Sequence, residues 1–451
     1  MDGQGLEKRK TRSDDGIADR RLALNLYSST YNFLWRSFGF KVIDLLSRKS
    51  QQDSEFKQGR LGFYDGLKIS GKPRIWSHAA SVGEVTGAIP TLFSLKKSLP
   101  HAALFLSTGT PQGLKFARAQ LPADVAVFPF PFDFPGCVSK AISTLQPELF
   151  VNFETEFWPN FFRELNARGI PALLLNGRVS SSSERFYRIV SPLFRPVFEQ
   201  FTHMAMHSDE DRERIVRIGA PPSKISVLGS SKYDGLAGKA SPEKADFWRG
   251  LLDIGNGPVI IGGSLRGSET IELMRIHQQL RGFSAGLLGI FAPRHMNKIP
   301  KMIDWLKKNN TPYDLLSQIE EGSRVRTASV VLVDRIGVLF EIYSVGDLIF
   351  CGGTFEPVGG HNILEPPAWS RAVFYGPCLK KVLHEHRILR NFGGSFVATG
   401  PEDLFLQWKK WLGDLSELQK NGEAANRALN SLRGVVDRQV ELILDSLRKA
   451  G

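Results

Sequence analysis

Cysteine is scarce in this 451-residue sequence: Cys137, Cys351 and Cys378 lie far apart, and none belongs to a CxxC motif. This spacing argues against a disulfide framework or a zinc site, and it fits a reducing, cytosolic-side environment. The histidines are scattered too. His384 and His386 lie close together, but no carboxylate or cysteine pattern near them would complete a metal site. We therefore expect no metal ion.

The chain also lacks an uncharged apolar run of about 18 residues, so a bilayer-spanning helix is not predicted. Residues 22–47 come nearest, since they are rich in Leu, Phe, Tyr and Trp, but Arg36 and Lys41 interrupt them. No small-residue cleavage site indicates a signal peptide. An aromatic-rich amphipathic helix with flanking basic residues can lie in a membrane interface. The alternative is a helix packed on the protein's own core.

Positive charge is in excess, with 58 Lys and Arg against 46 Asp and Glu, a formal net charge of +12. This excess suggests a polyanionic partner such as nucleic acid, anionic lipid or a phosphorylated substrate. No RNA-binding signature or aromatic-basic interleaving accompanies it, so nucleic acid is not favoured. Hydrophobic content of 42% and charged content of 23% are typical of a soluble globular protein. The length exceeds one ordinary core, which predicts two domains.

From residue 74 onward, short apolar runs alternate with amphipathic stretches, which predicts α/β domains with parallel, doubly wound sheets. The strands are expected at residues 74–79, 103–107, 125–128, 149–153, 172–175, 204–206, 225–228, 258–261, 287–291, 329–333, 348–351, 373–375 and 395–398. Helices are predicted between most of them, for example over residues 184–200 and 269–280.

Three parts of the chain are predicted. Residues 1–50 form a polar tail, disordered over 1–21, and the membrane-associating helix. Residues 51–238 and 239–451 form two Rossmann-like domains, and the last helical stretch, 424–449, closes the second. Ligands of such sheets bind at the carboxyl ends of strands, here in the cleft between the domains.

Several strand-end loops carry unusual polar residues. Gly83 and Glu84 follow the first strand, where Glu84 is either a helix-end residue that satisfies free backbone N–H groups or a general base. Glu154 and Glu156 follow the fourth strand, beside a Trp and a Pro. They either hold neighbouring loops in place or, together with the segment 176–180 that ends the fifth strand, bind a polar acceptor or position a base.

The second half of the chain contains the turn Gly359–Gly360, which precedes a short helical segment carrying Asn362 and Glu365. The glycines either form a tight turn with positive φ or let backbone N–H groups approach an anion. Arg294 lies at the end of another strand, a place suited to gripping phosphate. The acidic run 209–211 is interpreted as a helix cap with solvated charges.

Taken together, the motifs closely resemble those of the 3-deoxy-D-manno-octulosonic acid (Kdo) transferases of lipopolysaccharide assembly, the WaaA/KdtA family. The shared motifs, in family order, are SVGE (81–84), TPQG (110–113), PFD-x-P (131–135), ETEFWPN (154–160), NGRVS (176–180), GSSKYD (229–234), APRH (292–295) and GGHNILEP (359–366). The resemblance covers roughly residues 22–400. It implies a GT-B-type architecture and inverting transfer of Kdo from CMP-Kdo to the 6'-hydroxyl of the lipid A precursor (lipid IVA), without a metal or other cofactor. It also implies association with the cytoplasmic face of the inner membrane, with an anionic membrane surface as partner.

By motif, the resemblance assigns Glu84 as the catalytic base. It places further residues on the acceptor side (Ser81, Gly83, Glu154, Glu156, Asn176, Arg178) and on the CMP-Kdo side (Ser264, Arg294, His295, Gly359, Gly360, Asn362, Glu365). The chain departs from the family pattern at residues 263–266 and 378–386 and in its long N-terminal tail. Two alternatives are another sugar-nucleotide enzyme, such as a UDP-sugar epimerase or a lipid-linked hexosyltransferase, and a catalytically silent binder of lipid phosphates.

Overall fold

The computed structural model describes residues 31, 54–64, 66–67 and 69–450. The predicted tail and all but Tyr31 of the predicted helix at residues 22–47 lie outside this part of the chain. The described chain forms two compact units. One contains the residues up to Lys232 together with those from Gly434 onward, and the other runs from Tyr233 to Arg433.

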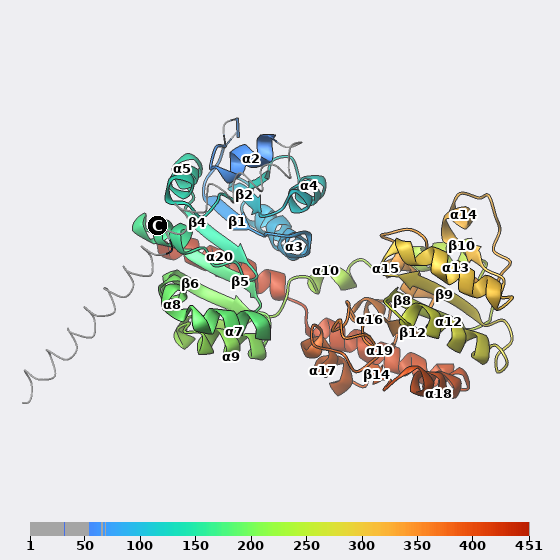
Figure 1. Ribbon diagram of the computed structural model, residues 1–451. Coiled ribbons are helices and arrows are strands. Elements are labelled where there is room, and N and C mark those ends of the chain that lie inside the picture. The colour runs from blue at the N-terminus through green and yellow to red at the C-terminus, as the bar shows by residue number, and fades with distance from the viewer. Residues whose placement is uncertain (1–30, 32–53, 65, 68, 451) are drawn as a thin grey trace, which may run out of the picture. The chain divides into compact units, whose positions relative to one another are not determined.

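The first unit is built on a seven-stranded sheet with the order β3-β2-β1-β4-β5-β6-β7, in which every pair is parallel. Helices cover both faces of this sheet (Figure 1), so its strands are almost wholly buried. The strands are β1 (Arg74–His78), β2 (Ala103–Thr108), β3 (Ala126–Pro129), β4 (Leu149–Phe153), β5 (Ala172–Gly177), β6 (Phe201–Met206) and β7 (Ile225–Val227). The helices are α2 (Ser54–Arg60), α3 (Val82–Ser98), α4 (Pro111–Gln120), α5 (Pro135–Leu145), α6 (Pro159–Ala167), α7 (Ser181–Ile189), α8 (Ser191–Gln200), α9 (Asp209–Arg217) and α20 (Val435–Ala450).

The second unit has the same architecture, with a parallel sheet of order β10-β11-β9-β8-β12-β13-β14. Its strands are β8 (Val259–Leu265), β9 (Leu288–Pro293), β10 (Asp314–Leu315), β11 (Val330–Leu332), β12 (Leu348–Cys351), β13 (Val373–Tyr375) and β14 (Ser395–Val397). Its helices are α10 (Asp234–Ala237), α11 (Pro242–Leu251), α12 (Glu269–Leu280), α13 (Ile299–Lys308), α14 (Leu316–Glu320), α15 (Leu339–Ile342), α16 (Glu365–Ala368), α17 (Leu383–Asn391), α18 (Pro401–Leu412) and α19 (Leu415–Ser431).

The C-terminal end of the chain departs from the predicted organisation. The stretch expected as one helix over residues 424–449 is divided between α19 and α20, because Gly434 adopts a φ of +78° that ends the run. Helix α20 then packs on α3 of the first unit, where Val436, Val440 and Ile443 enter the apolar cluster on that face of the sheet. The last helix therefore belongs to the first unit and does not close the second.

Each sheet has a switch point, where the chain stops adding strands on one side and begins adding them on the other. In the first unit it lies between β1 and β4, and in the second between β8 and β12. Connections leave such a pair of strands in opposite directions, which opens a crevice at their carboxyl ends. Within the described part of the chain, no helix is both long and apolar enough to cross a bilayer.

Candidate active site

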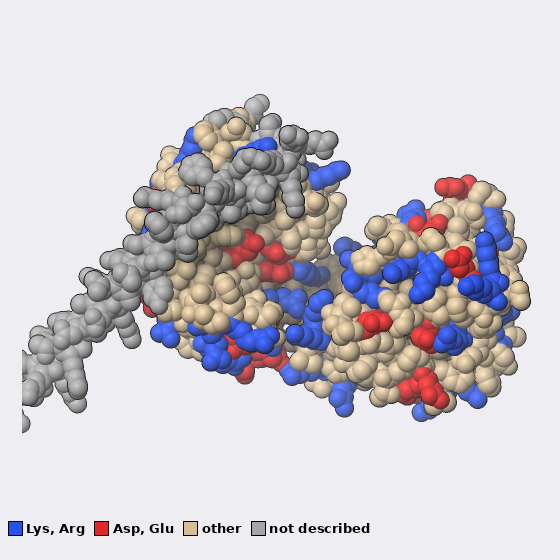
Figure 2. Space-filling view, in the orientation of Figure 1, with Lys and Arg blue, Asp and Glu red and all other residues tan. Residues whose placement is uncertain are grey.

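The predicted carboxylates of the first unit lie at its switch point. Strand β1 ends at His78 and leads into α3, whereas β4 ends at Phe153 and leads directly to Glu154. Acidic side chains are visible in Figure 2 close to the tip of β4 as drawn in Figure 1. The structure thus brings together the two acidic loops that the sequence places about 70 residues apart.

Glu84 folds back onto the N-terminus of its own helix. Ser81 is the N-cap of α3: its Oγ accepts from the Glu84 N–H at 3.4 Å and donates to Glu84 Oε1 at 2.9 Å. The Ala80 N–H donates to Glu84 Oε2 at 2.7 Å. This is a Ser-x-x-Glu capping arrangement, so Glu84 does serve the helix end, and its role as a base stays a prediction.

The surroundings of Glu84 make its carboxylate more basic than usual. Burial raises the pKa of Glu84, and the charge of Glu154 raises it further, while the hydrogen bond from Ala80 lowers it in part. Next to it, Gly83 is exposed, and a Cβ at this position would meet only Ser81 Oγ, at 3.9 Å. Packing does not require a glycine here, so its effect is to leave the first turn of α3 uncovered.

Glu156 is held by a buried histidine that the sequence analysis did not single out. His78, at the end of β1, has no exposed surface, and its Nε2 lies 2.9 Å from Glu156 Oε2. Trp158 donates to the same oxygen at 3.0 Å. Burial acts to raise the pKa of Glu156, but the hydrogen bonds from His78 and Trp158 outweigh it and lower the pKa on balance. Glu156 therefore stays ionised at neutral pH.

Glu154 pairs with a lysine from the segment where the chain leaves the first unit. Its backbone φ is +62°, and its Oε1 lies 2.5 Å from Lys232 Nζ. Both side chains are partly exposed, at 20% for Glu154 and 30% for Lys232. The pair leaves Glu154 within reach of a polar substrate.

The two predicted residues at the end of β5 differ in accessibility. Asn176 is 2% exposed, and its amide is used within the fold, in bonds to Ser231 and Gln439. Arg178 is exposed, just beyond the end of the strand. Asn176 therefore supports the fold from a buried position, whereas the side chain of Arg178 lies at the surface.

In the second unit, a buried glutamate connects the two loops of the switch point. Glu269, which the sequence analysis gave no role, has no exposed surface at the start of α12. Its carboxylate accepts backbone N–H groups of Arg266, Gly353, Thr354 and Phe355 at 2.7 to 2.9 Å. These four bonds fix the loops after β8 and β12 against one another.

The Gly359–Gly360 turn has the conformation that its sequence predicts. The φ angles are +95° and +91°, and a Cβ at Gly360 would lie 2.7 Å from Val382 Cγ2. The Gly360 N–H donates to Gly353 O at 2.8 Å, which ties the turn to the end of β12. Both glycines are thus required by the backbone.

Asn362 lies in the turn before α16 rather than on the helix, contrary to the prediction. Its Oδ1 accepts from the Leu364 N–H at 3.2 Å, and its Nδ2 donates to Glu365 Oε1 at 3.1 Å. Burial raises the pKa of Glu365 to about 7, partly offset by the bond from Asn362. Because α16 has only four residues, its dipole would attract an anion to this loop only weakly.

Positive charge near this loop comes instead from cationic side chains around His361. Arg266 donates from Nε to His361 Nε2 at 3.0 Å. Burial lowers the pKa of His361 to about 4, and the charges of Arg266, Arg294 and Lys381 lower it further. His361 is therefore neutral at pH 7, and these three cationic side chains form a cluster around it. Such a cluster can hold a phosphate or a carboxylate.

Ser264, Arg294 and His295 lie at or just beyond the ends of two neighbouring strands, β8 and β9. Ser264 has a φ of +54° near the end of β8, and Arg294 and His295 are exposed just beyond β9. His295 also lines a cavity of about 220 Å³ beside Arg266, Lys298 and Glu356. Residues 378–386, which depart from the family pattern, contact the Gly359–Gly360 turn, because the Lys381 N–H donates to Gly359 O at 2.8 Å.

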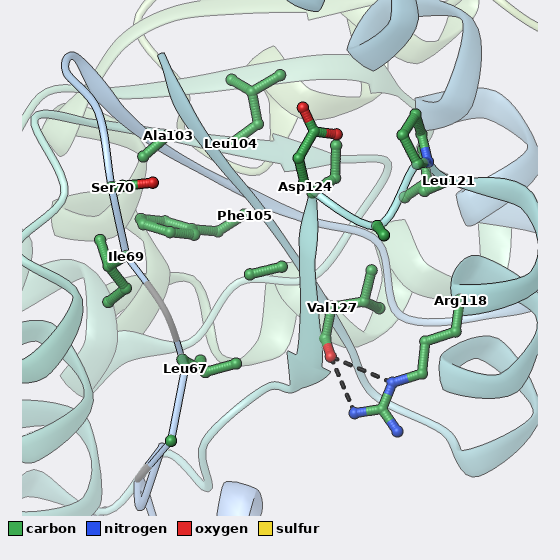
Figure 3. A pocket seen from close by; sticks show the side chains of 15 residues that line it. Leu67, Ile69, Ser70, Ala103, Leu104, Phe105, Arg118, Leu121, Asp124 and Val127 are labelled. Atoms are coloured by element: carbon green, nitrogen blue, oxygen red, sulfur yellow. Dashed lines mark hydrogen bonds between the residues drawn. The ribbon is translucent and has the colours of Figure 1, made fainter. Parts of the chain in front are cut away.

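A larger cavity, of about 440 Å³, lies away from these groups. It is lined by the first residues of β2 and β3, including Ala103, Phe105 and Val127, and by Arg118, which donates from Nη2 to Val127 O at 3.1 Å (Figure 3). This is the amino end of the sheet, opposite the end where ligands of open parallel sheets bind. No predicted site residue lines it, and we do not take it as the active site.

Among the described residues, there is no cluster of three His, Cys, Asp or Glu residues able to hold a metal ion.

A family model and several relatives match this chain in sequence. Residues 56–235 match a family model described as 3-deoxy-D-manno-octulosonic-acid transferase (kdotransferase). The 3-deoxy-D-manno-octulosonic acid transferase of Chlamydia pneumoniae is 30% identical over 68% of this chain and 69% of its own length. That of Haemophilus influenzae is 29% identical over 90% of this chain and 95% of its own. A bifunctional glycosyltransferase/methyltransferase of Fusobacterium nucleatum is 28% identical over 81% of this chain, and the match spans about half of that protein, 53%.

Solved structures agree on the fold. A glycosyltransferase from Rickettsia africae superimposes with a TM-score of 0.58 at 14% identity, over 83% of this chain and 99% of that structure. At this identity the likeness establishes the GT-B α/β fold alone. The similarity in sequence to the Chlamydia pneumoniae enzyme and to the family model shows that the chain belongs to the 3-deoxy-D-manno-octulosonic acid (Kdo) transferase family.

Proposed function

We propose that this protein transfers Kdo from CMP-Kdo to the 6'-hydroxyl of the lipid A precursor, with inversion at the anomeric carbon and with Glu84 as general base. Family membership supports Kdo transfer in lipopolysaccharide synthesis. The observation that carries the finer proposal is the position of Glu84, a carboxylate of raised pKa at the switch point beside the uncovered Gly83.

In the proposed reaction, the acceptor hydroxyl attacks the anomeric carbon of Kdo while Glu84 takes its proton. The bond between that carbon and the CMP oxygen breaks, and its electron pair leaves with the phosphate. One base opposite the leaving group is sufficient for a single displacement with inversion. Glu154 and Arg178 are polar groups on the same edge of the sheet, and we assign them to the acceptor.

The donor is assigned to the second unit. Its cluster of Arg266, Arg294 and Lys381 around His361 matches the negative charge of CMP-Kdo, which carries one phosphate and one sugar carboxylate. These cations can stabilise the departing CMP, which is why we expect transfer without a metal ion. Glu365, beside Asn362, is suited to the ribose hydroxyls.

An acceptor embedded in a bilayer requires contact with the membrane surface, and α7 has the features for it. Phe186 is 59% exposed and Ile189 82% exposed, and Arg185 and Arg188 beside them are exposed as well. Figure 2 shows cationic side chains gathered over the α7–α9 region. Apolar and basic residues on one helix favour the surface of an anionic bilayer. Because α7 follows β5, it begins close to Arg178.

The direct test is a transfer assay with the full chain, CMP-Kdo generated in situ and a tetra-acylated lipid A precursor, in the presence of EDTA. Mass spectrometry of the lipid would report product and count the Kdo units added. Product with EDTA supports donor, acceptor and metal independence together. If folded protein gives no product while CMP-Kdo is intact, the proposal is wrong, and a lipid-linked hexosyltransferase or a silent lipid-phosphate binder is the better interpretation.

The membrane contact has its own test. The double variant Phe186→Ser/Ile189→Ser should bind vesicles of anionic phospholipid less than wild type in co-sedimentation, because it loses the exposed apolar surface of α7. Phe247→Ser is the matched control, since Phe247 is 58% exposed in the second unit. Equal binding by the double variant and the control would contradict the assignment of α7.

A further inference from the structure

A buried hydrogen-bond network joins the end of β5 to both segments where the chain leaves and re-enters the first unit. Asn176 donates from Nδ2 to Ser231 Oγ at 2.7 Å, and its Oδ1 accepts from the Ser231 N–H at 3.1 Å. The same Oδ1 accepts from Gln439 Nε2 at 2.8 Å. The chain leaves this unit after Lys232 and returns at Gly434. One amide group therefore holds both segments.

The network continues onto α3, the helix that carries Glu84. Thr91 donates from Oγ1 to Gln439 Oε1 at 2.7 Å, and Ser231 donates from Oγ to Gly87 O at 2.5 Å. Gly87 and Thr91 follow Glu84 at i+3 and i+7, which places all three on one face of the helix. The exposed fractions of Thr91, Ser231 and Gln439 are at most 1%. A fully satisfied buried network of this kind fixes the position of the elements that it joins.

The same residues determine where Lys232 lies. Lys232 follows Ser231 directly and pairs with Glu154 at 2.5 Å. A Cβ at position 87 would lie 3.1 Å from both Lys232 Cε and Asn176 Nδ2. Glycine at this position thus allows the lysine stem and the asparagine amide to pack directly on α3.

We propose that Gln439, from the last helix of the chain, is a positioning residue for the transfer reaction: through Asn176 and Ser231 it holds Lys232 against Glu154 and fixes Glu84 relative to both. The inference rests on the proposed function, since it assigns a role to a residue that does not touch the substrate. It makes α20, which the sequence analysis placed in the other domain, a necessary part of the carboxylate site.

The proposal has a consequence for the pH dependence of the reaction. The charged and titratable groups around Glu84 are Glu154, Glu156 and His78, with Lys232 paired to the first of these. If Lys232 loses its fixed position, the charge of Glu154 is less well compensated. The carboxyl of Glu84 then binds its proton more tightly, and the acid limb of the rate profile moves to higher pH.

The experiment compares three full-length variants in the transfer assay, with the acceptor dispersed in detergent. Gln439→Met keeps the length of the side chain and removes both hydrogen bonds, and Thr91→Val keeps the shape of Thr91 and removes one. Ser446→Ala is the control, because Ser446 is buried on the same helix and donates to Leu442 O of its own turn. We expect kcat of Gln439→Met to fall about tenfold, which corresponds to about 1.4 kcal/mol, with its acid limb shifted to higher pH. KM for CMP-Kdo should stay within about twofold, since its proposed site is in the second unit.

A lower melting temperature of Gln439→Met with unchanged kcat and acid limb would overturn the proposal, because the network would then be only structural. If Gln439→Met does not fold, Thr91→Val decides in the same way, with a smaller shift in the same direction expected. Absence of product with wild-type protein would refute the proposed function itself. An active wild type with unaltered variants would refute only the role of Gln439.

Discussion

Replacing Glu84 with glutamine separates the two roles that this residue combines. Glutamine keeps the shape of the side chain: its carbonyl oxygen can still accept from the Ala80 N–H, and its amide can donate to Ser81 Oγ, which now accepts a bond instead of giving one. The N-terminus of α3 therefore stays capped, and we expect the melting temperature to change little. The amide cannot take a proton from the acceptor. Turnover should thus fall by about 10²- to 10⁴-fold, the usual contribution of a positioned general base.

The assay is the initial rate of Kdo transfer at saturating donor and acceptor, with thermal unfolding measured on the same preparations. Asp209→Asn serves as control, because it removes an exposed carboxylate from the first turn of α9 in the same unit. Ser81→Ala tests the opposite case: it should cost about 1 kcal/mol of stability through the lost N-cap, with a much smaller effect on turnover. A folded Glu84→Gln protein with kcat within about fivefold of wild type would refute the reasoning, since such a loss is below what a general base contributes.

Three further predictions concern the charges of the two units. Glu154→Gln removes a charge that raises the pKa of Glu84, so the acid limb of kcat/KM should move to lower pH, and an unchanged limb would contradict the coupling. Arg294→Ala should raise KM for CMP-Kdo at least about tenfold, as expected for a lost charge-assisted bond to phosphate, whereas the exposed Lys307→Ala should not. Glu365 has a folded pKa of about 7, above its unfolded value. Its contribution to the free energy of unfolding is therefore complete at acid pH, and it is lost as the pH rises to the folded pKa of about 7. Glutamine at this position cannot ionise. Glu365→Gln should thus gain stability relative to wild type between pH 5 and pH 8, as measured by urea unfolding.

Much of the fold follows from local sequence pattern. Buried parallel strands are apolar on both faces, and amphipathic helices separate them, so the alternation of the two was enough to predict two Rossmann-like domains and 13 of the 14 strands in the described part of the chain. The missing strand, β10, has only two residues, Asp314–Leu315, which is too short for a pattern. The helix predicted over 184–200 is two helices that meet at Val190, since Pro192 in the first turn of α8 cannot donate a hydrogen bond backwards.

The site could be predicted only in part, because its partners are distant in sequence. Glu84, Glu154 and Glu156 stand in loops directly after predicted strands, and so their proximity follows from topology. The partners Lys232 and His78 each lie 78 residues from the carboxylate that they contact. Nothing in the local sequence around either residue indicates that contact. The burial of His78 at the end of β1 and the return of α20 to the first unit are properties of tertiary packing, which a periodic pattern does not encode.

The position of Glu84 on a helix cap explains how one carboxylate can be held in place and still be basic. A flexible glutamate loses side-chain entropy when it is fixed, and the bonds from Ala80 and Ser81 offset that loss without using any substrate group. Those bonds also favour the ionised form, which would make a weak base if they acted alone. Burial and the charge of Glu154 oppose them and raise the pKa. The cap therefore fixes the geometry and the surroundings set the basicity, so a change at Glu154 can alter the basicity of Glu84 while its position is kept.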